Sequence, residues 1–192
     1  MSVLVGFSGA SGSGKTTLVK ALYERLKKDG YNVGIVNEVA RIVFNKYKDV
    51  FDWKSLDQIR NSEKVKLYQK LILTHQYQYE EKALREYDIV LTDRTLYDSL
   101  MYTLLHINDL HYLANYVSLF LKYKPKERYD VVFLCSPVNS NLNDGFRTAV
   151  DIATQTLQHE LLKMLLHDYV LLDGDFATRF ADALSIIKLY VL

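Results

Sequence analysis

The chain has 192 residues, with 49% hydrophobic side chains, 24% charged side chains and a formal net charge of +1. These values are typical of a single globular domain over 1–192, and they disfavour a long nucleic-acid backbone as a partner, because nucleic-acid-binding surfaces are usually basic. The one cysteine, Cys135, excludes an intramolecular disulfide, and its apolar context VVFLC predicts a buried thiol.

The first half of the chain alternates short apolar runs with long helical patterns. Asp29-Gly30 supplies a stop signal for the first helix, and a lysine-rich passage precedes the second. We interpret the sequence NKYKD at 45–49 in that passage as a solvated charged loop. The predicted elements are strands over 3–8 and 31–38, a helix from about Lys15, and one long helix over about 55–86.

The second half follows the same alternation. The predicted elements are strands over 87–93, 129–135 and 169–173, and helices over 148–167 and 176–190. The apolar stretch 96–121 carries Asp98, His106 and Asp109, which favour a packed helix pair over a membrane span. Burial in the core and dimerisation through residues 99–121 both fit this stretch. No signal peptide is evident after Met1, so we expect a cytoplasmic protein.

Several of the predicted strands are apolar throughout and lack a polar alternation. Strands of this kind are typical of a parallel sheet with helices on both faces. The alternation of strands and helices therefore predicts an α/β fold with three layers and a five-stranded, mainly parallel sheet.

The stretch GASGSGKTT at 9–17 lies between the first strand and the first helix and satisfies the phosphate-binding loop pattern G-x-x-x-x-G-K-[ST]. Glycines let backbone N–H groups converge on phosphate oxygens, Lys15 supplies a positive charge to them, and the Thr16 hydroxyl is a magnesium ligand. The cofactors expected are ATP and Mg²⁺. The predicted phosphate-contacting residues are Gly9, Ser11, Gly12, Ser13, Gly14, Lys15, Thr16 and Thr17. This Walker A loop predicts the P-loop strand order 2-3-1-4-5.

Asp93, at the end of the strand DIVLTD, is the predicted second support for magnesium, and Arg94 follows it directly. GTP-dependent switches place a glycine shortly after this aspartate, and ring-forming ATPases place a second acid there. An Asp-Arg pair at the end of a strand is what small-molecule and nucleotide kinases favour.

Four segments resemble the P-loop nucleoside and nucleotide kinases, and most of all the nicotinamide riboside kinase-like ATPase domains; thymidylate and deoxynucleoside kinases are relatives. These segments are GASGSGKTT (9–17), NEVAR (37–41), DRTLYDSLMY (93–102) and NDGFR (143–147). The resemblance implies that Glu38 lies near the acceptor hydroxyl as a base or an orienting group, with Asp93 as an alternative base. It also implies that Arg94 holds the acceptor or the transferring phosphoryl group.

Three further residues have two readings each. Arg41 is either a substrate contact or a member of a surface ion pair. Asp98 and Tyr102, four residues apart on one helical face, either line the acceptor pocket or serve as a helix-start acid and a packed tyrosine. The resemblance also implies a short lid over about 136–147, whose one cation is Arg147.

The principal hypothesis is an ATP- and Mg²⁺-dependent kinase that phosphorylates a nucleoside, a nucleotide or a similar small molecule. A P-loop ATPase that regulates a partner is the alternative, and a polynucleotide-end kinase is disfavoured by the neutral charge. The stripe Tyr68, Ile72, His75 and Tyr79 on the long helix either stacks a base or belongs to the core; the core reading is preferred.

Overall fold

A computed structural model describes residues 2–138 and 151–191 of the chain. The described strands form one sheet of order β2-β3-β1-β4-β5, and all four neighbouring pairs are parallel. The strands are β1 (Val3–Gly9), β2 (Val33–Val36), β3 (Ile89–Asp93), β4 (Val131–Cys135) and β5 (Val170–Leu172). The α/β fold and the predicted strand order are confirmed.

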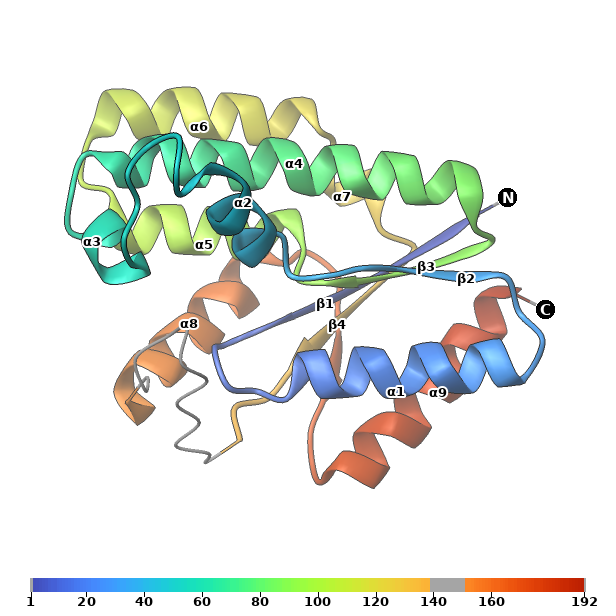
Figure 1. Ribbon diagram of the computed structural model, residues 1–192. Helices are drawn as coiled ribbons and strands as arrows, with labels where there is room; N and C mark the ends of the chain where they lie inside the picture. Colours follow the sequence, from blue (N-terminus) through green and yellow to red (C-terminus); the bar gives the residue numbers. More distant parts are fainter. Residues whose placement is uncertain (1, 139–150, 192) are drawn as a thin grey trace.

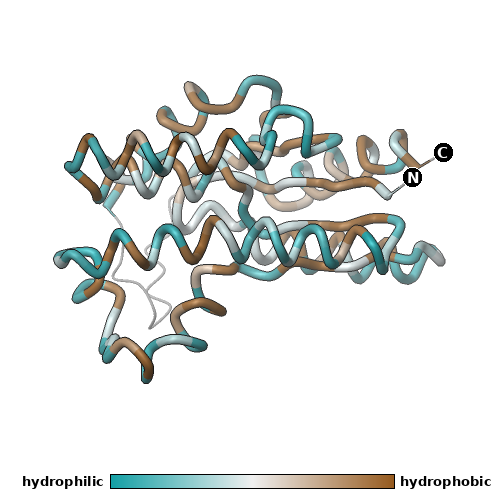
Figure 2. The backbone as a smooth tube through the Cα atoms, turned by 90° about the horizontal axis from the view of Figure 1, so that it is seen from above, coloured by the Kyte–Doolittle hydropathy of each residue, from teal (hydrophilic) through white to brown (hydrophobic). Residues whose placement is uncertain are grey.

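The helices cover both faces of the sheet (Figure 1). On one face lie α1 (Lys15–Lys28) and α9 (Phe176–Val191). The helices α2 (Val39–Tyr47), α3 (Leu56–Arg60), α4 (Lys64–Glu86), α5 (Leu96–His106), α6 (Leu110–Lys122) and α7 (Pro125–Arg128) lie on the other, and α8 (Ile152–Leu165) lies beside α5 and β1. Hydrophobic and hydrophilic residues alternate along the helices (Figure 2), so each helix turns an apolar stripe toward the core.

The core divides into layers on either side of the sheet. Phe7 and Phe133, on neighbouring strands, are fully buried with their ring centroids 5.1 Å apart, and they pack against α1 and α9. Leu4 and Val90 point to the opposite face, where they contact the cluster formed with α2, α3 and α4. Successive residues of a strand point to opposite faces, so a strand buried on both sides is apolar throughout, as the sequence indicated.

The segment between β2 and β3 differs from the prediction in two ways. The expected single helix over 55–86 is two helices, because Ser62 interrupts it: its hydroxyl donates to Ile59 O at 3.0 Å and accepts from Lys64 N at 3.3 Å. Serine competes for backbone hydrogen bonds in this way at helix ends. The expected charged loop at 45–49 is also wrong in part, because its first three residues complete α2, which Val39 and Val43 anchor in the core.

Two other predictions need adjustment at their ends. The stretch 96–121 is a pair of helices, as predicted. The helix predicted over 148–167 is described from Ile152 to Leu165, and the Asp151 side chain caps it by accepting from Thr154 N at 2.7 Å. Among the helices of residues 2–138 and 151–191, none has the length and apolar character required to span a bilayer.

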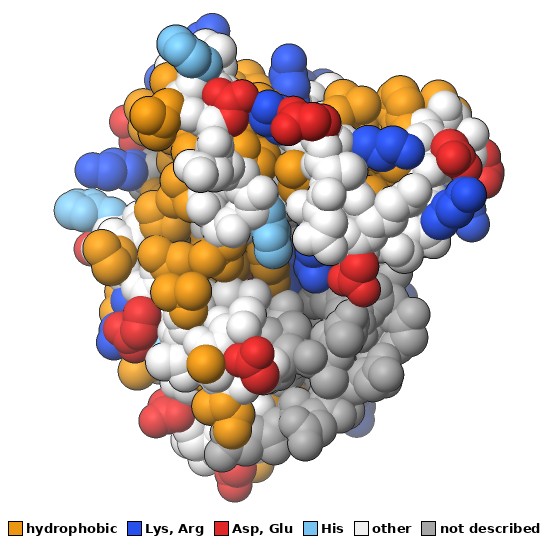
Figure 3. Space-filling view, turned by 90° about the vertical axis from the view of Figure 1, so that its left-hand side faces the viewer, with side chains coloured by type: hydrophobic (Ala, Val, Ile, Leu, Met, Phe, Trp, Pro, Cys, Tyr) orange, Lys and Arg blue, Asp and Glu red, His pale blue; other side chains and the backbone are white. Residues whose placement is uncertain are grey.

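The carboxyl ends of the parallel strands meet at one edge of the sheet, which Figure 1 shows at the left. The turn after β1 leads into α1, the turn after β2 into α2 and the turn after β3 into α5. Figure 3 looks onto this side of the molecule, where basic and acidic side chains are interspersed among hydrophobic ones. In open α/β sheets this edge carries the ligand crevice.

Candidate functional site

The loop between β1 and α1 has a backbone that glycine makes possible. A Cβ on Gly9 would lie 2.8 Å from the Cys135 carbonyl oxygen and 2.9 Å from Ser13 Oγ, which is closer than real Cβ contacts allow. Gly14 adopts φ +80° and forms the N-cap of α1, a left-handed conformation that other residues rarely adopt. The loop therefore folds back over the end of β1 and delivers the chain into α1.

The first turn of α1 presents its backbone N–H groups at the mouth of this loop. The amides of residues 15–17 have no intrahelical carbonyl to bind, as at any helix start. Thr16 and Thr17 are exposed, so both residues are accessible from solvent. Together with the positive end of the helix dipole, this arrangement suits an anion such as a phosphate group.

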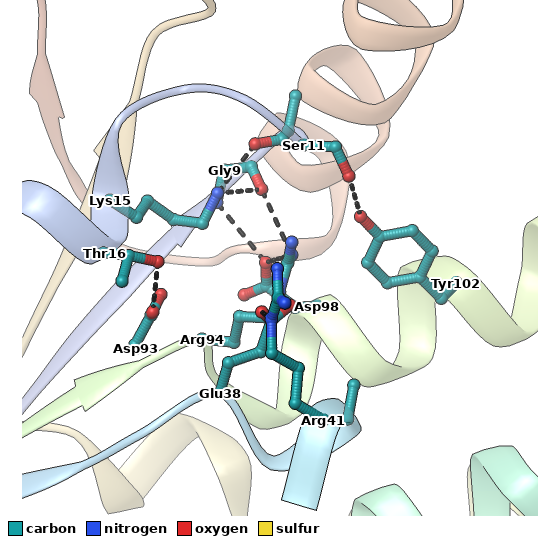
Figure 4. A network of polar contacts seen from close by, with 12 residues as sticks. Gly9, Ser11, Lys15, Thr16, Glu38, Arg41, Asp93, Arg94, Asp98 and Tyr102 are labelled. Carbon is teal, nitrogen blue, oxygen red and sulfur yellow. Dashed lines mark hydrogen bonds and ion pairs between the residues drawn. The ribbon is translucent and has the colours of Figure 1, made fainter. Parts of the chain in front are cut away.

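The Lys15 side chain is folded onto the loop itself (Figure 4). Its Nζ donates to Gly9 O at 2.8 Å, to Ala10 O at 2.7 Å and to Ser13 Oγ at 2.9 Å. Burial, reinforced by the nearby Arg94 charge, lowers the pKa of Lys15 to about 8. Burial and the Arg94 charge thus disfavour the protonated form of Lys15, whereas a phosphate anion beside it would favour that form.

Thr16 and Asp93 meet at the foot of α1, where the Thr16 hydroxyl donates to Asp93 Oδ2 at 2.5 Å (Figure 4). Asp93 is buried at the end of β3, whereas Thr16 is exposed. A hydroxyl beside a carboxylate is an all-oxygen donor set, which suits Mg²⁺ that is shared with phosphate oxygens. The two predicted metal-side residues therefore lie together and fit the ion that the sequence implies.

Arg94 has a distinctive backbone for a residue with a side chain. Its φ is +89°, a region in which a Cβ is disfavoured. Its amide donates to Phe7 O at 3.0 Å, and its carbonyl accepts from Thr92 Oγ1 at 2.8 Å and from Gln76 Nε2 at 3.2 Å. Strained backbone of this kind persists only where neighbours hold it in place, and it clusters at functional sites.

The Arg94 guanidinium joins three segments of the chain (Figure 4). Its Nε donates to Glu38 Oε1 at 3.1 Å, and one terminal nitrogen donates to Asp98 Oδ1 at 2.9 Å and to Gly9 O at 3.4 Å. Burial opposes the charge, but Tyr102 and the two nearby aspartates favour it and raise the pKa of Arg94 above its usual value. The charge is therefore permanent and fixed in direction.

Glu38 and Arg41 form the second ion pair at this point. Glu38 is the N-cap residue of α2, and its Oε2 accepts from Arg41 Nε at 3.0 Å. The Glu38 side chain is 10% exposed and that of Arg41 is 38% exposed. Glu38 thus lies between two guanidinium groups with a narrow opening to solvent, and Arg41 stands at the outer rim.

Asp98 serves the helix start and the site at once. It completes a capping box with Thr95, since Asp98 Oδ2 accepts from Thr95 N at 3.1 Å. The same Oδ2 accepts from Ser8 Oγ at 2.7 Å, while Oδ1 faces Arg94. Asp98 is 1% exposed and both of its carboxylate oxygens are engaged within the fold, so in this conformation it orients Arg94.

Tyr102 connects the phosphate-binding loop to α5. Its hydroxyl lies 2.7 Å from Ser11 Oγ, and its ring lies 5.1 Å from the Arg94 guanidinium carbon. The His106 ring stacks beside it with a centroid distance of 6.1 Å. Tyr102 therefore borders both the loop and the pocket described next.

A pocket lies between α2, α3, α4 and α5 and opens toward Arg94. Apolar and aromatic side chains line one part of it, and the polar lining comes from Arg60, Gln69, Gln76, Arg94, Thr95, Asp98, Ser99 and Tyr102. Its volume of about 40 Å³ holds a few water molecules in this conformation. Tyr68 and Ile72 of the aromatic stripe line it too. Tyr79 also packs in the core, as predicted, and His75 packs against Tyr47.

Two polar residues that support the loop were missed by the sequence analysis. Gln158 on α8 accepts the Ser11 backbone N–H at 2.9 Å. Arg179 on α9, 6% exposed, donates to Ser13 O at 3.2 Å, to Ser136 O at 3.0 Å and to Gly174 O at 2.9 Å. The sequence shows a glutamine and an arginine on amphipathic helices, but it does not show that either side chain is buried. Neither residue could therefore be singled out without the fold.

Two predictions remain, one for Cys135 and one for the lid with Arg147. The thiol of Cys135 is buried as predicted, and burial raises its pKa to about 11. Arg147 and most of the predicted lid at 136–147 lie outside the described residues.

Comparisons with known proteins agree with this architecture. A family model described as an AAA domain matches residues 4–179. A probable thymidylate kinase of Sulfurisphaera tokodaii is 53% identical over 38 residues, which are 20% of each chain. A NadR protein solved in complex with NR superimposes with a TM-score of 0.76 at 23% identity, covering 98% of this chain and 51% of that one. A NadR protein in complex with NAD and AMP-PNP gives a TM-score of 0.73 at 22% identity, with coverages of 98% and 49%.

The solved structures and the family model support different conclusions about this chain. The chain spans about half the length of the solved structures that it resembles, and at this identity the likeness shows the fold. The family match covers most of the chain, including the loop, Asp93 and Arg94.

Proposed function

The chain belongs to this AAA domain family of P-loop proteins, and from that premise we propose that it is an ATP- and Mg²⁺-dependent kinase. In this proposal the γ-phosphoryl group of ATP passes to a hydroxyl or phosphate oxygen of a nucleoside-like small molecule. We further propose that residues 1–192 act as one domain.

One observation carries the proposal: two cations from different halves of the site converge on one carbonyl oxygen. Lys15 Nζ reaches Gly9 O from the phosphate-binding loop at 2.8 Å, and the Arg94 guanidinium reaches it from the pocket side at 3.4 Å. In the transition state of transfer, the phosphoryl group carries negative charge that must be neutralised from both the donor and the acceptor side. The convergence of Lys15 and Arg94 supplies cations from both directions.

The donor half would hold the phosphates of ATP. Backbone N–H groups of the loop and of the first turn of α1 would bind phosphate oxygens, and Lys15 would leave the loop carbonyls to bind them as well. Thr16 and Asp93 would hold Mg²⁺, which supplies charge neutralisation to the phosphates when bound. AMP-PNP in a structural neighbour supports a nucleoside triphosphate as the donor.

The acceptor half would bind and orient the hydroxyl group that is phosphorylated. Glu38 directly precedes Val39 and Ala40, which line the pocket, and its two carboxylate oxygens are engaged by Arg41 and Arg94. We assign it the role of orienting the acceptor hydroxyl and receiving its proton. Asp93 is the second candidate for that proton. NR in a structural neighbour, and the partial match to a probable thymidylate kinase, support a nucleoside-like acceptor.

A nucleoside is larger than the pocket in its present conformation. Admission of an acceptor would therefore require α2 and α3 to move away from α4 and then to close over the bound acceptor. This motion would make acceptor binding part of assembling the site, so ATP would turn over slowly in the absence of an acceptor.

The test is ADP formation against a panel of nucleosides, nucleoside monophosphates and small hydroxylated metabolites, in the presence of Mg²⁺. A kinase forms ADP and a phosphorylated product in equal amounts, and only with particular acceptors. Slow phosphate release that is indifferent to the whole panel would contradict the proposal and favour the alternative, a regulatory ATPase that acts through a partner protein.

A further inference from the structure

A buried carboxylate on α4 is linked through hydrogen bonds to the strained turn that carries Arg94. The carboxylate belongs to Glu80, which is fully buried. Its Oε2 accepts from Arg128 Nε at 2.6 Å, and its Oε1 accepts from Gln76 Nε2 at 2.8 Å and from the Tyr129 hydroxyl at 3.1 Å. Gln76 and Tyr129 each contact the turn in their own right, so Glu80 reaches it by two routes.

The first route runs through Gln76 and Thr92 to the carbonyl group of Arg94. Gln76 Nε2 donates to Thr92 Oγ1 at 2.7 Å and lies 3.2 Å from Arg94 O. The Thr92 hydroxyl donates to Arg94 O at 2.8 Å, which is its nearer acceptor because Glu80 Oε1 lies 3.5 Å away. An amide nitrogen carries two hydrogens. Glu80 takes one of them and thereby directs the other toward Thr92 and Arg94.

The second route runs through Tyr129 to the backbone that follows Arg94. The backbone N–H of Leu96, the first residue of α5, donates to the Tyr129 hydroxyl oxygen at 2.9 Å. The hydrogen of that hydroxyl is then free to point at Glu80 Oε1, 3.1 Å away. The turn is therefore held at the carbonyl group of Arg94 and at the amide of Leu96, and Glu80 is common to both attachments.

These attachments matter because the backbone conformation of Arg94 is unfavourable by itself. Its φ is +89°, and a residue with a Cβ keeps such a conformation where its neighbours impose it. A rotation of this backbone would carry the guanidinium away from Gly9 O, which it reaches at 3.4 Å. In the proposed reaction that guanidinium is the acceptor-side cation, and a displacement of about 1 Å at a reacting centre can cost about 10²-fold in rate.

Stability alone is a weak reason for a charged pair at this position. The Glu80 and Arg128 side chains are 0% and 7% exposed, and the cost of removing two charges from water can exceed what their attraction returns. Apolar side chains of the same volume often give equal or greater stability. A carboxylate provides what they cannot, since its oxygens fix the direction of donors on α4 and on the segment between α7 and β4.

We propose that Glu80 is a positioning residue for phosphoryl transfer, and that it acts through Gln76, Thr92 and Tyr129 to hold the Arg94 turn in its catalytic conformation. This inference rests on the proposed function and deepens it, because it names the group that fixes the direction of the acceptor-side cation.

The experiment uses two pairs of matched variants. Glu80→Met removes both carboxylate oxygens, and Glu81→Met is its control: Glu81 accepts from the same Arg128 at 2.8 Å and is 35% exposed. Thr92→Val removes the hydroxyl group that binds Arg94 O while the ion pair of Glu80 stays in place, and Thr92→Ser keeps that hydroxyl. The Thr92 pair decides the question if Glu80→Met does not fold.

Each change is made in the natural chain and in Arg94→Ala, and phosphoryl transfer from ATP to the acceptor found in the panel is measured. In the natural chain Glu80→Met and Thr92→Val should lower kcat by about 10-fold with an unchanged KM for ATP, whereas Glu81→Met and Thr92→Ser retain kcat. In Arg94→Ala the same changes should have no further effect on kcat, because the cation that they position is already absent. Losses of equal size in both backgrounds would show a structural role alone and would overturn the proposal.

A spectroscopic measurement separates this proposal from the kinase function. The Nε–H group of Arg94 donates to Glu38 in a buried position, so its proton–nitrogen NMR signal should exchange slowly with water; its absence from Arg94→Lys identifies it. The signal should shift in Glu80→Met and Thr92→Val and stay in place in Glu81→Met.

The two levels of the hypothesis therefore fail in different ways. If the signal shifts as expected but no member of the panel is phosphorylated, the kinase function is wrong and the hold of Glu80 on Arg94 stands. If the signal stays in place in Glu80→Met and Thr92→Val, or if these variants transfer phosphoryl groups as fast as their controls, the assignment of Glu80 is wrong.

Discussion

The donor half and the acceptor half of the site are built in different ways. The donor half is nearly continuous in sequence: one loop and the first turn of α1 provide the backbone amides, Lys15 and Thr16, and Asp93 is its contribution from elsewhere. The proposed acceptor half takes Glu38 from the end of β2 and Arg94 from the end of β3, beside a pocket lined from α2, α3, α4 and α5. The donor half depends on backbone shape, and the acceptor half depends on side chains that tertiary packing brings together.

This difference has a consequence for mutation. Backbone amides cannot be removed by substitution, so the donor half should be sensitive at its charged side chain and tolerant around it. The acceptor half is a chain of ion pairs, in which Arg94 holds both Glu38 and Asp98. Loss of one member there should affect stability as well as activity.

The largest effect is expected for Lys15→Met. The change removes the cation that stabilises charge on the transferring phosphoryl group, and kcat/KM should fall by about 10³-fold or more. Lys20→Met, at an exposed position of the same helix, is the matched control and should retain full activity. A coupled ADP assay measures both. Phosphoryl transfer that survives Lys15→Met would remove Lys15 from the mechanism.

Arg94→Ala should be the most damaging change in the acceptor half. It leaves two buried carboxylates without their shared cation, and breaking a buried pair in this way costs about 3–5 kcal/mol of unfolding free energy. Activity should fall by about 10²-fold as well, since a transition-state cation is lost. Arg85→Ala, at an exposed position, should change neither quantity. Urea unfolding and the same ADP assay provide the measurements.

Arg94→Gly adds a test of the strained backbone. Glycine lacks the Cβ that opposes φ +89°, so Arg94→Gly should be about 1 kcal/mol more stable than Arg94→Ala although both lack the guanidinium. Equal stability of the two variants would show that the backbone conformation costs nothing at this position.

The pH dependence of ATP binding should isolate Lys15 within the donor half. In the ligand-free protein the pKa of Lys15 is about 8, and phosphate anions favour the charged form. Above pH 8, ATP binding requires the uptake of a proton, so the dissociation constant should rise about tenfold per pH unit. Calorimetric titrations with ATP at about pH 7, 8 and 9 measure this dissociation constant. A dissociation constant that does not change with pH would contradict the prediction, because the lysine would then keep its proton throughout.

Lys15 also makes the stability of the ligand-free protein depend on pH. Rising pH weakens ATP binding but increases the contribution of Lys15 to stability. The unfolded chain holds the lysine proton up to pH 10.5, whereas the folded protein releases it near pH 8. Between these values the unfolded state binds more protons, so the contribution of Lys15 to the unfolding free energy increases with pH. Subtracting the profile of Lys15→Met removes the contributions of tyrosines and other lysines that titrate in this range.

The contrast between the halves also explains what could be predicted from the sequence. The fold followed from apolar strands and helical periodicity, and the loop followed from one contiguous motif. Glu38, Arg94 and Asp98 were named because they follow strands or begin a helix, positions that a sequence reveals. Glu80 and Gln158 were not named, because a polar residue in the middle of a helix is ordinary until the fold shows that it is buried. The break at Ser62 was missed for a similar reason, since helical propensity outweighs one serine in any local reading.

The smallest effect, expected for Gln158→Leu, tests whether the donor half is as self-contained as its sequence suggests. Gln158 Oε1 accepts the Ser11 N–H at 2.9 Å across 147 residues of sequence, so α8 supports the loop at this point. Loss of the partner leaves a buried amide unsatisfied and should cost about 1–2 kcal/mol of unfolding free energy, with a few-fold rise in the KM for ATP. Gln58→Leu is the matched control: Gln58 Oε1 also accepts a backbone N–H, from Lys54 at 2.9 Å, but in an exposed position, where water can replace it. If both variants behave alike, the loop keeps its shape without α8, and the donor half is fully contained in the β1–α1 segment and Asp93.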